Sequence, residues 1–538
     1  MTVVKVESME VKHLPLIVAL SCLWLSLFIL YFAILAMNSG HMVYVVDDAY
    51  IHLAISRNLN EFSVFGVTRY EFSSSSSSPI WNLIISAGFL LVGINEMLPL
   101  VLNVVLASIA VVTVYALRKD FDISQQYLTC VLLSFVFFTS LPSLVFTGME
   151  HILHIILSLF FIVLSSRVLS SEARFGRESV LLFIVTLFVS ATRIESIFLV
   201  IPVTLLFLKK RNWIYALIVL GMAAVPWIAY GIVSIQQGWF LLPNSLIVKG
   251  RETVQLGIGW FFVRGIVNLA IAPYVLVLLA ASVKLLTLQG QEFWQSDNIM
   301  RLLFVSACLM HMQFANIGWF FRYEAYLIAL GIFTVAVSAR RFFSELDLSS
   351  KNISTMQTSP KRSRLYALGL IALLITPVAA RGGLAIAWTP IASNNIYDQQ
   401  YQMALFLDRF YTGEVVMLND IGYANYLADI VCIDKWGLGT LEVGRLWIDG
   451  SISADAIRTV ATNHGVKIAI LYLDSLVPSE WEVVGYWTIR DNVVAYNTTV
   501  AFLAVMPSER DGLIDNLIEF SSILPEDVVE RGLYTTFV

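Results

Sequence analysis

The sequence HLPLIVALSCLWLSLFILYFAILAM (residues 13–37) is followed, after a short connection, by VVDDAYIHLAISRNLNEFSVFGVTRYEFSSSSSSPIW (residues 45–81). The first segment is a predominantly apolar run, and a helix of about 20 such residues is long enough to cross a bilayer. It is too long for the apolar part of a signal peptide, so we interpret it as an uncleaved first helix. The second segment is polar and begins with two adjacent acids, Asp47 and Asp48. Ionisable side chains held beside a membrane-length helix are costly and mark functional sites.

The composition excludes a soluble protein. Of the 538 residues, 58% are hydrophobic and 14% are charged, and the mean hydropathy is +0.77. Charged residues make up about 25% of an average soluble domain, so this chain has too few to cover a surface that faces water. We therefore predict a polytopic α-helical membrane protein that lacks the basic surface needed to bind nucleic acid.

Eleven apolar runs are candidates for membrane-spanning helices. They lie near residues 14–37, 98–117, 124–142, 151–167, 179–192, 194–208, 213–234, 258–286, 299–317, 325–339 and 365–380. The fifth and sixth runs are short, and we expect two helices that meet at a polar turn. Lysines and arginines cluster on alternate connections, which predicts a cytoplasmic N-terminus and places the loop with the two acids on the outer face. The short apolar segment 79–93 is predicted to be a helix at that outer face.

The last part of the chain differs in character. The segments VVMLND (415–420), KIAILYL (467–473) and VVAYNTTVAFLAV (493–505) are typical of strands, and ADAIRTVATNHG (454–465) is typical of a helix that ends at a glycine. We predict a transmembrane catalytic domain, residues 1–383, whose active-site loop spans residues 38–97. An extracytoplasmic α/β domain, residues 384–538, is predicted to follow it.

Asp47 and Asp48 open a segment in which Ile51, Ile55 and Leu59 share one helical face. One carboxylate could cap this helix and the other could favour its dipole. Alternatively, a carboxylate at the mouth of a membrane cavity could act as a base or a metal ligand. The residues alone leave both interpretations open.

Six stretches of this chain, in order, resemble one enzyme family. The loop VVDDAYIHLAISRNLN…SSPIW is similar to the first outer loop of GT-C glycosyltransferases in the group that contains the mycobacterial terminal arabinofuranosyltransferase. The other five similar stretches are FTGMEHIL (146–153), ATRIES (191–196), GWFLLPNSLIVKG (238–250), FFRYEAYLIAL (320–330) and NDIGYANYLADIVCIDKWGL (419–438). ATRIES departs from the group's ATRPEG, which makes Arg193 a clearer functional candidate than Glu195.

The resemblance implies a GT-C-like protein with about eleven transmembrane helices, in the inner or plasma membrane. It would move a single sugar from a polyprenyl-phosphate donor to a glycan or lipid-glycan acceptor of the cell envelope, on the outer face and with inversion. Arabinofuranose is favoured as the sugar by the resemblance alone. The attacking hydroxyl needs a general base; the resemblance assigns this role to Asp47, and the opposite assignment to Asp48 stays open.

A lipid phosphate that leaves during the reaction calls for cationic partners. The predicted substrate-binding residues are His52, Arg57, Glu150, Arg193, Lys249, Arg322, Tyr323 and Glu324. Plainer interpretations exist: Glu150 could favour a helix N-terminus, Glu324 could pair with Arg322, and His52 could be a packed polar residue. Interfacial arginines such as Arg264 are expected to extend towards lipid headgroups.

Other expectations concern cofactors, loops and competing functions. The resemblance requires no cofactor, although the carboxylates would suit Mg²⁺ or Mn²⁺. The serine run 73–78 is expected to be a mobile lip, and Asp420, Asp434 and Trp436 could contact an acceptor or hold strand-end turns. The main competing function is a transporter or flippase of lipid-linked sugar. Transporters commonly carry inverted repeats, and the sequence shows none by eye.

Overall fold

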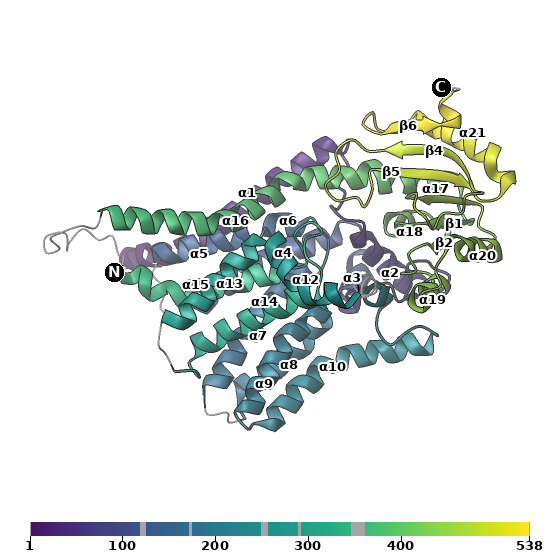
Figure 1. Ribbon diagram of the computed structural model, residues 1–538. Coiled ribbons are helices and arrows are strands. Elements are labelled where there is room, and N and C mark those ends of the chain that lie inside the picture. The colour runs from purple at the N-terminus through teal and green to yellow at the C-terminus, as the bar shows by residue number, and fades with distance from the viewer. Residues whose placement is uncertain are drawn as a thin grey trace.

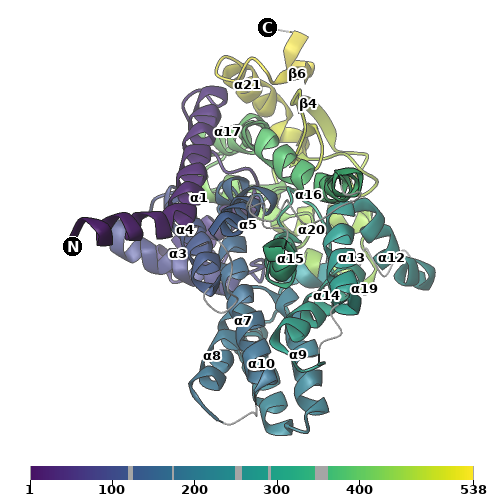
Figure 2. The same cartoon turned by 90° about the vertical axis from the view of Figure 1, so that its left-hand side faces the viewer.

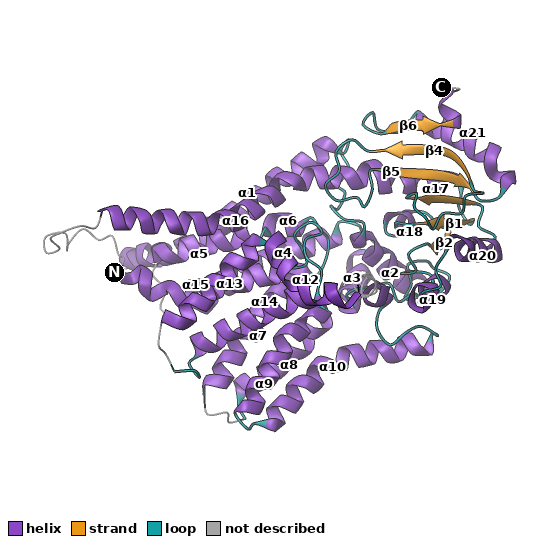
Figure 3. Cartoon of the chain, in the orientation of Figure 1, coloured by secondary structure: helices purple, strands orange, loops and turns teal. Residues whose placement is uncertain are grey.

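The computed structural model describes residues 2–118, 125–171, 175–248, 257–288, 292–345 and 361–536. Helices dominate these residues, and a six-stranded sheet lies near the C-terminus (Figure 3). The helices are α1 (Thr2–Met37), α2 (Asp48–Phe62), α3 (Pro79–Val92), α4 (Leu98–Leu117), α5 (Gln125–Phe138), α6 (Leu141–Val145), α7 (His151–Ser170), α8 (Arg177–Thr192), α9 (Ile197–Lys209), α10 (Trp213–Gln236), α12 (Gly257–Ile271), α13 (Pro273–Leu288), α14 (Ser296–Phe314), α15 (Ala325–Glu345), α16 (Lys361–Ile396), α17 (Gln402–Phe410), α18 (Tyr423–Leu427), α19 (Leu441–Asp449), α20 (Ala454–His464) and α21 (Arg510–Ser521). The strands are β1 (Val415–Leu418), β2 (Val431–Asp434), β3 (Ile468–Leu471), β4 (Glu482–Thr488), β5 (Thr499–Ala504) and β6 (Val529–Gly532).

The apolar runs form helices close to their predicted positions. In the described part of the chain, four helices are long and apolar enough to cross a membrane: His13–Met37 within α1, and α4, α7 and α10. A fifth span results if α12 and α13 are counted together. The predicted membrane protein with many helices is thus confirmed, whereas the number eleven is not.

Two breaks divide the apolar runs. The run 258–286 splits into α12 and α13, which meet at an angle of 100° around Ala272. The following residue, Pro273, has no N–H with which to continue the ladder of α12. Helices α8 and α9 are 16 and 13 residues long and meet at a 3₁₀ turn, Ile194–Ser196, which confirms the expected polar turn.

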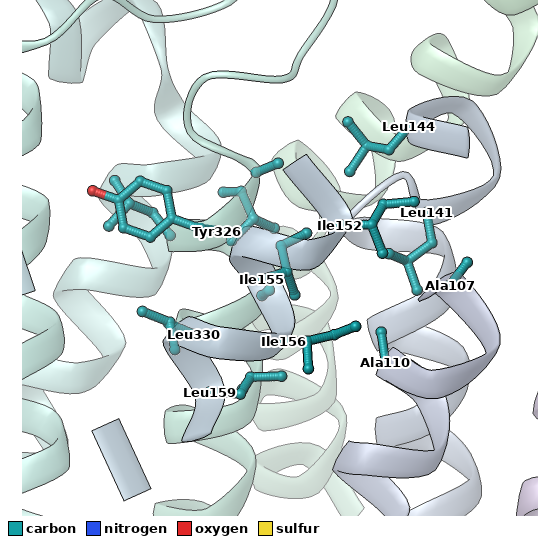
Figure 4. Close-up of a cluster of buried hydrophobic side chains, with 14 of the residues drawn as sticks. Ala107, Ala110, Leu141, Leu144, Ile152, Ile155, Ile156, Leu159, Tyr326 and Leu330 are labelled. Atoms are coloured by element: carbon teal, nitrogen blue, oxygen red, sulfur yellow. The ribbon is translucent and has the colours of Figure 1, made fainter. Parts of the chain in front are cut away.

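The core of the helical part lies around α7. Figure 4 shows side chains of α4, α6, α7 and α15 packed together, with Ala107 and Ala110 facing the larger residues Ile152 and Ile156. Most of α7 is buried, as expected for a helix that is apolar on all sides. Helix α7, which begins directly after Glu150, is therefore firmly packed.

The C-terminal part is an α/β domain, as predicted. Its strand order is β2-β1-β3-β5-β4-β6, in which β1 pairs in parallel with β2 and β3 and the other pairs are antiparallel. The three segments predicted as strands contain β1, β3 and β5. Helix α20 ends at Gly465, whose φ of +67° suits a glycine at a helix C-terminus.

One long helical connection joins the two parts. Helix α16 lies beside α1 and continues through a π-helical turn, Tyr397–Tyr401, into α17 (Figures 1 and 2). The domain boundary predicted at residue 384 therefore falls inside α16. The loop predicted to hold the active site lies between the helical bundle and the sheet domain (Figure 1), and Ile51 and Ile55 of α2 belong to the sheet domain's core.

The serine run is not a mobile lip, and that expectation was wrong. Five of the six serines are buried. The Ser74 hydroxyl bonds to the Tyr230 hydroxyl (2.8 Å), and the Ser76 hydroxyl donates to Asn82 Oδ1 (2.5 Å). The run is thus held between α3 and α10 because its hydroxyl groups find partners on both helices.

Candidate active site

A cavity of about 170 Å³ lies at the ends of several helices, next to the loop with the two acids. Its charged and polar lining consists of Asp48, Ser77, Arg193, Glu195, Ser245, Arg264, Asn316, Arg322 and Tyr323. Its apolar lining consists of Met149, Ile194, Phe198, Leu246, Phe314 and Ala315. Three arginines therefore share a small space with two carboxylates and with an apolar wall.

Arg322 and Asp48, which both line this cavity, form an ion pair. Arg322 is 1% exposed; its Nη2 donates to Asp48 Oδ2 and its Nη1 lies 2.7 Å from the Met149 sulfur. Its Nε has no hydrogen-bond partner among the described residues. The Asp48 side chain keeps 32% of its surface accessible. Arg322 thus retains a donor for a ligand, and the Asp48 side chain is partly accessible.

The backbone that carries Arg322 is strained. Trp319, Phe320 and Phe321, directly before it, have φ values of +42°, +58° and +58°. Bulky residues rarely adopt this left-handed conformation, and such strain gathers at functional sites. Arg322 follows this turn directly, and its guanidinium reaches Asp48 at the start of α2.

Arg193 is held by two glutamates. Its Nη1 donates to Glu150 Oε1 and its Nη2 to Glu195 Oε1, each at 2.6 Å. Glu150 is buried, and its other oxygen lies 3.8 Å from Nε2 of His52. Glu150 and His52 therefore lie behind Arg193, outside the cavity lining, and support it.

Asp47 and Arg57 face the sheet domain. The oxygens of Asp47 accept from the N–H groups of Gly422 (2.7 Å) and Tyr423 (2.8 Å). Arg57 donates to the carbonyl oxygens of Asn425 (3.2 Å) and Tyr426 (2.5 Å). Asp47 makes no capping bond to α2, so the helix-cap interpretation does not describe it. Neither residue belongs to the cavity lining.

The stability difference between the wild type and Asp47→Asn is expected to depend on pH. Burial, together with the nearby carboxyl group of Asp420, raises the pKa of Asp47 from 3.8 to about 8. The folded protein then holds a proton that the unfolded chain releases above a pH of about 4, so folding becomes less favourable as the pH rises towards 8. Asparagine does not titrate, so the variant should lose less stability over this interval. Unfolding midpoints of both proteins at pH 5 and pH 8 test this; equal losses would contradict it.

Glu324 does not pair with Arg322, and that suggestion was wrong. It is buried outside the cavity lining, where it accepts from the Tyr274 hydroxyl (3.0 Å) and the Gly318 N–H (2.8 Å). Its cationic partner is Arg381 of α16, at 3.4 Å. Arg322 is paired with Asp48, whereas Glu324 is paired with Arg381 of α16.

Glu324→Gln is expected to lower the free energy of unfolding by about 3 kcal/mol, because it leaves the buried Arg381 without its carboxylate. Thermal unfolding in detergent measures this loss. Donor affinity should stay close to wild type, since Glu324 does not line the cavity. If Glu324→Gln had normal stability but bound the donor more weakly, Glu324 would be a donor-binding residue and this prediction would be wrong.

Sequence reasoning missed several residues of the cavity lining, among them Arg264 and Ser245. Arg264 of α12 lines the cavity rather than reaching towards headgroups, and its Nη2 donates to the carbonyl of Ala315 and to Asn316 Oδ1. Ser245 is 5% exposed, and its hydroxyl has no partner in the described part of the chain. An arginine within an apolar helix was the available signal for the first. Lys249 lies outside the described residues.

Of the three candidates in the sheet domain, Asp434 holds a turn, whereas Asp420 accepts hydrogen bonds from Gln400 and Tyr472. Asp434 is buried and accepts from the N–H groups of Trp436, Leu438 and Gly439. Trp436 stacks on Trp447, with ring centres 5.7 Å apart. Among the described residues, no group of three or more histidines, cysteines or acids is arranged to hold a metal ion.

The helical membrane part, the acid-bearing loop and the C-terminal sheet domain together define an ArnT-like GT-C fold. The structure is similar to the crystal structure of ArnT from Cupriavidus metallidurans bound to undecaprenyl phosphate. The TM-score is 0.50 and the identity 13%, over 91% of this chain and 98% of that one. The apo structure of the same protein matches over the same shares with 13% identity and a TM-score of 0.48.

Sequence comparisons add one local match. A model described as a domain of unknown function (DUF8728) matches residues 394–503, within the C-terminal part. No curated protein matches the sequence. The GT-C fold expected from the sequence is thus confirmed, and the narrower resemblance to arabinofuranosyltransferases stays a prediction.

Proposed function

We propose that this protein is a membrane glycosyltransferase that moves a single sugar from a polyprenyl-phosphate donor to a glycan acceptor of the cell envelope. The observation that carries the proposal is the cavity in which Arg193, Arg264 and Arg322 meet Asp48. Such a reaction needs cations for a leaving phosphate and a base for an attacking hydroxyl. This cavity offers both kinds of group within one small volume.

The arginines are suited to the donor phosphate. A guanidinium group binds phosphate through two parallel N–H groups, and Arg322 has an Nε–H without a partner among the described residues. Phe198, Leu246 and Phe314 supply an apolar wall for the first part of a lipid chain. The similar fold of ArnT, crystallised with undecaprenyl phosphate, supports a lipid phosphate as the leaving group.

Asp48 is the better candidate for the base, because it lines the cavity while both oxygens of Asp47 are bonded to the sheet domain. In this mechanism the acceptor hydroxyl transfers its proton to Asp48 as its oxygen bonds to the anomeric carbon. The bond from that carbon to the phosphate oxygen breaks, and the arginines stabilise the polyprenyl phosphate that leaves. Attack opposite the phosphate inverts the anomeric centre. We place the reaction on the outer face, following the distribution of basic residues.

A reconstitution experiment tests this function. Purified protein in lipid nanodiscs is incubated with a panel of polyprenyl-phosphate sugars, arabinofuranose included, and a cell-envelope glycan extract. The expected result is consumption of one donor with equal release of polyprenyl phosphate and of glycosylated acceptor. If no donor is consumed, and the same protein in vesicles moves lipid-linked sugar between leaflets, the protein is a flippase instead.

A further inference from the structure

Helix α18 of the sheet domain is bonded at both ends, by Asp47, which directly precedes α2, and by Arg57 within α2. The N–H groups of Gly422 and Tyr423 donate to the carboxylate of Asp47, and Arg57 donates to the carbonyl oxygens of Asn425 and Tyr426. Groups at the ends of a helix have no partner within that helix. The acid loop therefore supplies partners for α18 that the sheet domain itself does not provide.

The contact between the two helices is also tightly packed along its length. The ring of Tyr50 stacks on that of Tyr423, with centres 3.7 Å apart and an angle of 27° between planes. Ile51 and Ile55 of α2 share a buried cluster with Val416 of the sheet. Both apolar and polar groups thus join the active-site loop to the C-terminal domain.

Gly422 is required by this close approach. A Cβ atom at this position would lie 2.1 Å from the backbone oxygen of Asp47 and 2.6 Å from its Oδ2. The φ of Gly422 is −77°, so its backbone conformation does not require glycine. Glycine is required because Asp47 occupies the space that a side chain would need.

We infer that Asp47 is a positioning residue that docks the C-terminal domain onto the active-site loop and thereby aims Asp48 into the cavity. Successive residues on a helix point about 100° apart. With Asp47 fixed on α18, Asp48 is directed to Arg322. The inference rests on the proposed function in taking Asp48 as the base, while the docking itself does not depend on any activity.

Hydrogen exchange in the full-length protein tests the docking without an activity assay. Asp47→Asn and Gly422→Ala should each raise the exchange rate of the segment 421–427 by at least about tenfold, because each breaks bonds between α18 and the loop. The segment 468–471 in β3 should be unchanged, which shows that the domain stays folded. Gly512→Ala is the matched control, since its new methyl group meets nothing within 4 Å. Unchanged exchange of 421–427 in both variants would overturn the inference.

The pH dependence of transfer separates positioning from base catalysis. Asp47→Asn and Gly422→Ala should both lower kcat by about tenfold with little change in donor KM. In both variants the rate should still fall at acid pH, as in the wild type, because the general base is still present and becomes protonated there. If Asp47→Asn loses that fall while Gly422→Ala behaves as wild type, Asp47 is the base and the inference fails. If the protein has no transferase activity, the proposed function fails and the exchange experiment still decides the docking.

Discussion

Replacement of Asp48 by asparagine is expected to lower kcat for sugar transfer by about 10³-fold, because a positioned general base contributes about 10²- to 10⁴-fold. Asparagine has nearly the same shape and keeps an oxygen that can accept from Arg322, but it cannot take up the proton of the acceptor hydroxyl. Donor binding should therefore persist while turnover is lost. Single-turnover transfer with the donor identified in the reconstitution, together with a separate binding measurement, checks both parts.

Asp455→Asn is the matched control for this experiment. Its side chain is 82% exposed on α20, and the same change of charge there should leave kcat unaltered. Turnover by Asp48→Asn above about a tenth of the wild-type value would be more than loss of a general base allows, and would remove Asp48 from that role.

Arg322→Gln is expected to weaken binding of polyprenyl phosphate by about 10- to 100-fold, the loss expected for one or two hydrogen bonds to a charged group. Glutamine neither carries the charge nor presents the two parallel N–H groups of a guanidinium. Arg322→Lys should recover part of the affinity, because lysine restores the positive charge but lacks the two parallel N–H groups of a guanidinium. Direct titration with short-chain polyprenyl phosphate measures the three affinities.

Arg409→Gln controls for a general effect of removing positive charge. Arg409 is 46% exposed and pairs with Glu519 on the surface of the sheet domain, far in sequence from every cavity residue. The Arg409→Gln variant should bind polyprenyl phosphate with the same affinity as the wild type, within experimental error. An Arg322→Gln variant that binds the phosphate as tightly as wild type would locate the phosphate site elsewhere, with Arg264 the next residue to replace.

The regular elements that could be predicted are those decided by local pattern. The run at 98–117 is α4 with the same bounds, and the helix expected to end at Gly465 is α20. Strands β4 and β6 were missed. Each contains a glycine, Gly485 in β4 and Gly532 in β6, and glycine has a low preference for strands, so these strands depend on pairing with their neighbours.

The candidate site was predictable in its composition but not in its geometry. Asp48, Arg193 and Arg322 were singled out in advance and the cavity brings them together. Asp47 was preferred to Asp48, although the sequence holds nothing that distinguishes two neighbouring acids. Their difference arises from Gly422, some 375 residues further along the chain, which no local pattern connects with them.

By itself, the sequence determined that this chain is a membrane protein with a charged loop after its first helix and an α/β domain at its C-terminal end. Hydropathy and periodicity are local properties, and burial of apolar helices follows from them directly. Only the tertiary structure decided that Asp48 lines the cavity, that Arg264 joins it and that Glu324 and Arg57 serve other contacts. Ion pairs depend on distances of a few ångströms between segments far apart in the chain, and those distances exist only after the helices have packed.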